Sequence, residues 1–222
     1  MKLFDKDILL TDLGNARFGG VVSDNWSVNG NPNGGYLMAM IADAMLRKSD
    51  KKNTPLVTAN YLSRCVPGEV EIRISEITRS RQFTRFEARV SQQGEEKIRA
   101  LGTFAVDNTS CNVERYESKP PELAPVDECV QIPPMPKYTL FHNLDLRLDP
   151  GCAGWMVGKL TDVSQNKGYF SFSDGRPVEL LSLFLIIDSM PPAVMATQGM
   201  NSWVPTIELS VNIRNLPQTN RL

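Results

Sequence analysis

Two apolar segments of the chain share one pattern, in which an acidic residue stands inside a run of apolar residues. The first segment covers residues 34–45 and the second covers residues 179–190. Aspartate occupies the same slot in both, as Asp43 and Asp188. A segment that is apolar on nearly all faces predicts a helix buried on most sides, the first over residues 35–48. Because the pattern occurs twice, we predict an internal duplication.

A strand-like stretch follows each predicted helix and closes on the motif Arg-x-x-Pro. The two motifs are Arg64–Pro67 and Arg214–Pro217. Strand pattern continues after the first motif as far as residue 106, whereas the chain ends at Leu222 soon after the second. By analogy we expect the second module to lack its last strands and to have an open sheet edge. Either the chain is truncated or a partner completes the module.

Alternating apolar and polar residues predict antiparallel strands after the first helix. We expect them near residues 56–65, 69–79, 82–92 and 96–106, with a hairpin turn at 93–95. One buried helix followed by such strands predicts a sheet wrapped around that helix.

Further strands are predicted on both sides of a proline-rich segment. They lie near residues 18–28 in the first half, and near 141–148, 154–161, 167–173 and 203–214 in the second.

The proline-rich segment, residues 108–139, has little periodicity and predicts a linker. We therefore divide the chain into an N-terminal module at 1–107, this linker, and a C-terminal module at 140–222.

Composition and charge exclude several classes of function. The 222 residues are 41% hydrophobic and 22% charged, as in an ordinary globular protein. A net charge of −1 disfavours binding to nucleic acid or to an anionic membrane. With four widely spaced cysteines and one histidine, few ligands are available for zinc, so we expect reduced thiols and no metal.

Nothing in the sequence predicts a membrane segment or a signal peptide. The longest apolar run, Leu180–Ile187, is far shorter than the roughly 20 residues of a bilayer span. The N-terminus contains acidic residues and has no long apolar core. We therefore expect a cytoplasmic protein.

Two motifs, together with the paired helices, carry a resemblance to a known family. One is Asn33–Tyr36 at the start of the first helix, and the other is Trp-x-Pro-Thr-x-Glu-Leu at residues 203–209. Over roughly residues 15–107 and 140–217 the chain resembles the type II acyl-CoA thioesterases and the wider thioesterase-like superfamily. The resemblance implies an α+β double hot-dog fold. Each module would be an antiparallel sheet wrapped around one long buried helix, with the second module incomplete.

The resemblance also implies a reaction. In that family a carboxylate near the end of the second helix, a threonine on the next strand and a glutamine on the last strand hold a water that attacks the thioester carbonyl. The carboxylate matches Asp188 and the threonine matches Thr206, whereas the glutamine strand would lie beyond Leu222. The implied substrate is a fatty or other acyl-CoA in lipid metabolism, with no cofactor, and the implied assembly is a homo-oligomer.

Physical chemistry supports the same residues while leaving alternatives open. Burial raises the pKa of a carboxylate, which suits Asp188 to general-base catalysis, although an acid at a helix end can also be a solvent-exposed cap. Thr206 offers a hydroxyl to a water, but threonine is also a common strand residue. Asp43 is expected to be structural, because Leu56 stands where the matching threonine would fall.

The glycine pair Gly34 and Gly35 predicts a substrate-binding helix start. Backbone N–H groups at such a start stabilise the oxyanion of acyl transfer, and in hot-dog assemblies a helix start of one module can face the acid of the other. A tight turn that needs glycine would explain the pair equally well.

Three other functions remain possible at this point. One is a non-catalytic acyl-CoA-binding protein of the same fold, and another is a structural module whose open edge pairs with another chain. The third, a hot-dog enoyl-CoA hydratase, needs a second acid or base, and the single histidine, His142, lies more than 30 residues before the second helix. Arg79, Arg81 and Arg85 are candidates for the CoA phosphates.

Overall fold

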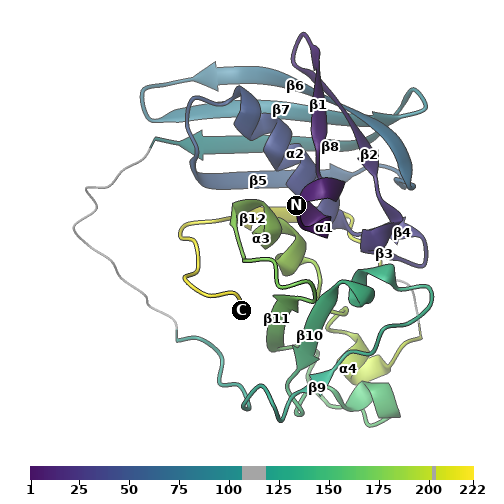
Figure 1. Cartoon of the computed structure of the whole chain (residues 1–222). Coiled ribbons are helices and arrows are strands. Elements are labelled where there is room, and N and C mark those ends of the chain that lie inside the picture. The colour runs from purple at the N-terminus through teal and green to yellow at the C-terminus, as the bar shows by residue number, and fades with distance from the viewer. Residues whose placement is uncertain (107–118, 202–203) are drawn as a thin grey trace.

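A large antiparallel sheet dominates the fold (Figure 1). The computed structural model of the chain describes residues 1–106, 119–201 and 204–222. The sheet contains β1 (Leu10–Gly14), β2 (Arg17–Val22), β5 (Asn53–Tyr61), β6 (Gly68–Arg79), β7 (Phe83–Gln92), β8 (Glu95–Ala105) and β12 (Glu208–Asn212). Its strand order is β1-β2-β6-β7-β8-β5-β12. The four antiparallel strands predicted after the first helix are therefore confirmed as β5, β6, β7 and β8. β6, β7 and β8 follow one another as a meander, whereas β5 pairs with β8 and not with β6.

The helix α2 (Gly34–Lys48) lies against this sheet (Figure 1). Its apolar side chains from Tyr36 to Met45 are buried apart from the Asp43 position, as the all-round apolar pattern predicts. Asn33 caps its first turn by accepting from the Tyr36 amide at 2.9 Å. Arg47 and Lys48 stand in the last turn, where positive charge is favourable.

The second half of the chain adds a smaller sheet and a second apolar helix. The sheet consists of β9 (Val130–Gln131), β10 (Leu144–Leu148) and β11 (Gly168–Phe172), in the order β11-β10-β9. The helix α3 (Leu180–Ile187) begins with a capping box, in which the Glu179 amide donates to Ser182 Oγ at 2.9 Å. The shorter elements are α1 (Leu3–Asp7), β3 (Ser27–Val28), β4 (Asn31–Pro32) and α4 (Met195–Gln198).

One segment differs from the predicted strands. The strand predicted near 154–161 is wrong, because a 3₁₀ helix occupies Gly154–Val157 and ends at Gly158 in the left-handed region. Local bonds, such as the Gly158 amide to the Trp155 carbonyl at 3.2 Å, take the place of strand pairing. The strand pattern near 18–28, which fits one strand or two short ones, forms the two strands β2 and β3 with a 3₁₀ turn at Asp24–Trp26 between them.

The two halves share the large sheet. β12 comes from the second half and pairs antiparallel with β5 of the first half, with Ser210 opposite Thr58. Of the predicted linker, residues 108–118 lie outside the described residues, while β9 in its remainder pairs with β10. The division of the chain at residues 107 and 139 stays a prediction.

Two further observations concern the described residues. Cys65, Cys129 and Cys152 are free and buried, and Cys111 lies outside the described ranges. No helix in these ranges combines the length and the apolar character that crossing a membrane requires.

Candidate active site

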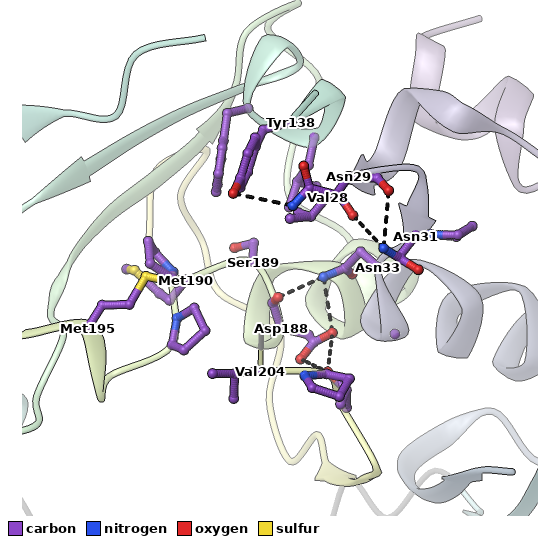
Figure 2. Close-up of a pocket in the computed structure, with 18 of the residues that line it drawn as sticks. Val28, Asn29, Asn31, Asn33, Tyr138, Asp188, Ser189, Met190, Met195 and Val204 are labelled. Atoms are coloured by element: carbon purple, nitrogen blue, oxygen red, sulfur yellow. Dashed lines mark hydrogen bonds between the residues drawn. The ribbon is translucent and has the colours of Figure 1, made fainter. Parts of the chain in front are cut away.

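A cavity of about 790 Å³ opens where the start of α2 meets the end of α3. Its polar wall includes Asn33, Gly34, Asp188 and Thr206, and Figure 2 shows the side chains of Asn33 and Asp188 turned toward each other. The remaining wall is largely apolar, with aromatic and methionine side chains such as Phe141, Trp155, Met190 and Met195. The cavity therefore combines a small polar cluster with room for an apolar group.

Asp188 stands directly after the last residue of α3. Its amide bonds the Leu185 carbonyl at 3.2 Å, a tight final turn, and two prolines a few residues later prevent the helix from continuing. Its carboxylate accepts from the Gly35 amide at 3.0 Å, from Asn33 Nδ2 at 3.0 Å and from Thr206 Oγ1 at 3.0 Å. Asp188 and Thr206, which the sequence predicted as a catalytic pair, are thus in direct contact.

Asn33 joins the two helices through one side chain. Its Oδ1 caps α2, and its Nδ2 donates to both the backbone carbonyl and the carboxylate of Asp188, at 2.7 and 3.0 Å. The carboxylate therefore lies at the positive end of the α2 dipole. The sequence marked Asn33 only as part of a motif, although an asparagine just before an apolar helix is a recognisable N-cap signal.

The glycine pair allows the two helices to approach closely. A Cβ added at Gly35 would lie 2.2 Å from the Phe184 carbonyl oxygen and 2.8 Å from Asp188 Cβ. A Cβ at Gly34 would lie 3.0 Å from Asp188 Oδ2. Close packing of α2 on α3 thus requires the pair. The Gly35 amide donates to Asp188 in this arrangement, so the helix start faces the acid of the other half.

Burial raises the pKa of Asp188 above its ordinary value of 3.8. The hydrogen bonds from Gly35, Thr206 and Asn33 favour the charged form and offset part of this effect. The carboxylate is therefore a stronger base than an exposed aspartate while it remains ionisable.

Tyr61 and Arg64 also belong to this cavity, and sequence reasoning assigned no role to either. Tyr61 Oη donates to the Gly34 carbonyl at 2.6 Å. Arg64 is exposed, and its Nη2 donates to the Gly30 carbonyl at 2.9 Å. The Arg-x-x-Pro motif marked Arg64, whereas nothing in the sequence pattern distinguished Tyr61.

Other residues considered from sequence lie in different surroundings. Asp43 pairs with Arg47 at 2.8 Å on the α2 surface, as a structural residue would. The exposed His142 bonds the Met135 carbonyl through Nε2 at 2.9 Å. Arg79 is held by Glu76 at 2.6 Å and by Asp50 at 3.1 Å. Within the described ranges, no group of three or more histidine, cysteine, aspartate or glutamate side chains is placed to hold a metal ion.

Family models place the chain among the thioesterases. The model for the acyl-CoA thioesterase N-terminal domain matches residues 22–105, and the model for the C-terminal domain matches residues 119–221. Together they match most of the chain, which therefore belongs to the acyl-CoA thioesterase family, and the resemblance seen in the sequence is confirmed. No curated protein sequence matches the chain.

Solved structures share the fold. A thioesterase II candidate from Thermobifida fusca is 23% identical with a TM-score of 0.89, and the match covers 98% of this chain and 84% of that one. A conserved hot-dog protein of unknown function from Alicyclobacillus acidocaldarius is 18% identical with a TM-score of 0.87, covering 99% and 81%. The tesB protein of Mycobacterium avium subs paratuberculosis is 16% identical with a TM-score of 0.67, covering 90% and 74%. At these identities the likeness shows the hot-dog fold.

Proposed function

We propose that this protein hydrolyses acyl-CoA thioesters to a free acid and CoA, with Asp188 as the general base. The observation that carries the proposal is the half-buried Asp188 carboxylate, hydrogen-bonded to Thr206 on the wall of a largely apolar cavity. A carboxylate whose pKa is raised by burial is suited to take a proton from water. The apolar wall would hold the acyl group.

The reaction needs one water and no covalent intermediate on the protein. Asp188 and Thr206 hold the water, Asp188 takes one of its protons, and the oxygen bonds to the thioester carbonyl carbon. The carbonyl oxygen becomes an oxyanion near the positive end of the α2 dipole, which favours negative charge, while the Gly35 amide itself stays on Asp188. The bond from carbon to sulfur then breaks, and the leaving thiolate takes the proton from Asp188.

The CoA moiety needs cations for its phosphates. Arg79 is already paired with Glu76 and Asp50, so it is a weaker candidate than the sequence alone indicated. Arg64 is exposed on the cavity wall, and we assign it to the phosphates in place of the three arginines around residue 80.

Thioester hydrolysis by the full chain tests the proposal. Released thiol is followed with a panel of acyl-CoAs of different chain length, for the wild type and Asp188→Asn. We expect the substitution to lower kcat by about 10³-fold, because it removes the proton acceptor. Asp43→Asn is the matched control, since it makes the same change in the duplicated slot, and it should leave kcat unchanged.

Two results would count against the proposal. Equal losses in the two variants would remove Asp188 from the mechanism. Binding of acyl-CoA by folded wild-type protein without turnover at any chain length would indicate a non-catalytic acyl-CoA-binding protein.

A further inference from the structure

The peptide unit between Gly34 and Gly35 is hydrogen-bonded on both sides. Its carbonyl oxygen accepts from Tyr61 Oη at 2.6 Å, and its N–H donates to Asp188 Oδ2 at 3.0 Å. Both bonds belong to one amide group. Phenol, peptide and carboxylate therefore form an unbroken chain of hydrogen bonds that ends on the proposed base.

Such a chain is cooperative. A hydroxyl that donates to a carbonyl oxygen polarises the amide and makes its N–H a stronger donor. A stronger bond from Gly35 to the carboxylate favours the charged form of Asp188 and fixes the direction of Oδ2. Tyr61 therefore acts on Asp188 although its hydroxyl bonds the Gly34 carbonyl rather than the carboxylate.

Tyr61 also holds the segment that carries Thr206. It is the last residue of β5, and its backbone amide donates to the Ile207 carbonyl at 2.9 Å, one residue after Thr206. One residue thus contacts the neighbours of both proposed catalytic side chains. The space around the phenol is tight, because a Cβ at Gly34 would lie 3.1 Å from Tyr61 Oη.

The other charged and titratable groups near these hydrogen bonds do not obscure the titration of Asp188. Burial, and then the negative charge of Asp188, raise the pKa of Tyr61, so the phenol stays a donor throughout the working range. Burial raises the pKa of Cys65, on the same cavity wall, to about 11. The other charged group on this wall is the Arg64 guanidinium. A change of protonation between pH 4 and 9 is thus expected from Asp188 itself.

Resting on the proposed function, we propose that Tyr61 is a positioning residue whose hydroxyl, through the Gly34–Gly35 peptide unit, sets the orientation and strength of the Asp188 base. It is not a catalytic residue in this scheme, because it acts through the peptide. A phenol that serves only to fill space would leave the Asp188 titration unchanged when its hydroxyl is removed.

The test compares Tyr61→Phe with Tyr169→Phe in the full chain. Tyr169 Oη donates to the Ala124 carbonyl at 3.1 Å, so the control removes the same kind of bond elsewhere. Two readouts are used, the pH profile of kcat/KM and the ¹³C titration of the Asp188 carboxyl, which needs no turnover. In Tyr61→Phe we expect both to move to higher pH by about half a unit to one unit, with kcat about 3- to 10-fold lower and KM less affected. Tyr169→Phe should move neither.

A third variant protects the test against misfolding. 3-Fluorotyrosine at position 61 keeps the shape and makes the hydroxyl a stronger donor, so the Asp188 titration should move to lower pH. An unchanged titration in both Tyr61 variants would overturn the inference. If the wild type shows no turnover, the proposed function fails, while the carboxyl titration still decides whether Tyr61 acts on Asp188.

Discussion

Asp188 carries its charge in a place that disfavours charge. Burial raises its pKa above the ordinary 3.8, and hydrogen bonds from Gly35, Thr206 and Asn33 recover only part of that cost. A residue chosen for stability alone would be neutral here. The arrangement therefore favours a functional role for Asp188. The cost of burying its charge can be detected by stability measurements without a substrate.

We predict that Asp188→Asn is at least as stable as the wild type at pH 8. Because the folded protein binds the Asp188 proton more tightly than the unfolded chain does, the free energy of unfolding falls as pH rises from 3.8 through the raised pKa. Above that pKa the wild type carries the whole free-energy cost of the buried Asp188 charge. The asparagine is neutral, its oxygen can accept from Gly35, and its NH₂ group can donate to Thr206 Oγ1.

Thermal melts of both proteins at pH 5 and pH 8 measure this. The Tm of Asp188→Asn relative to that of the wild type should be higher at pH 8 than at pH 5. Asp43→Asn serves as the control and should lose only about 0.5 kcal/mol, because it removes an i,i+4 pair on the helix surface. A large loss of stability in Asp188→Asn at pH 8 would contradict the prediction.

At the scale of elements, the site depends on how closely α2 approaches α3. The Phe184 carbonyl lies where a Cβ of residue 35 would stand, at 2.2 Å, and a backbone atom cannot move aside as a side chain does. Gly35 contributes the amide that binds Asp188 as well. Helix packing and site geometry therefore rest on the same residue.

We predict that Gly35→Ala lowers the free energy of unfolding by about 3 kcal/mol, because the two helices must separate to admit the methyl group. The rate of thioester hydrolysis should also fall, since the Gly35 amide moves away from Asp188. Chemical denaturation and the thiol assay measure the two effects. Gly151→Ala is the control, because its Cβ would meet Asp149 Oδ1, a side-chain atom, at 3.1 Å. Comparable losses in the two variants would argue against helix contact as the cause.

The sequence predicted the two helices better than it predicted the contacts between them. α2 and α3 were recognisable because each is apolar around its whole circumference. The 3₁₀ helix at Gly154–Val157 was read as a strand, because a single short turn leaves no periodic signal. The repeated pattern marked Asp43 and Asp188 alike, and the family resemblance selected Asp188. Its bonds to Gly35 and Asn33 join residues more than 150 positions apart, and no local pattern encodes them.

On the scale of the whole molecule, the N-terminus binds the two halves of the chain together. Phe4 of α1 is fully buried and packs on Trp26 of the first half and on Phe172 of the second, with ring centroids 5.4 and 5.6 Å apart. Together with the shared sheet, this contact makes one continuous core. The sequence did not predict it, since the contact joins the start of the chain to β11.

A buried cation completes this junction. Arg176 is 3% exposed, it bonds Asp5 of α1 through Nε at 2.7 Å, and its guanidinium lies 5.1 Å from the Phe4 ring centroid. Glu179 at 2.9 Å supplies a second carboxylate from the residue before α3. The charge is therefore paired with both halves of the chain, and removing it would leave two carboxylates without their partner.

We predict that Arg176→Met lowers the free energy of unfolding by about 2 kcal/mol, because it removes a buried cation from two carboxylates that are themselves partly exposed, while keeping an unbranched side chain of similar reach. Urea unfolding measures this, and a single transition is expected because both halves share one core. Arg99→Met is the control, since Arg99 pairs with Glu96 at 2.7 Å on the surface, and it should cost less than 1 kcal/mol. Two separate transitions in the wild type, or equal losses in the two variants, would mean that the halves fold independently of the Arg176 junction.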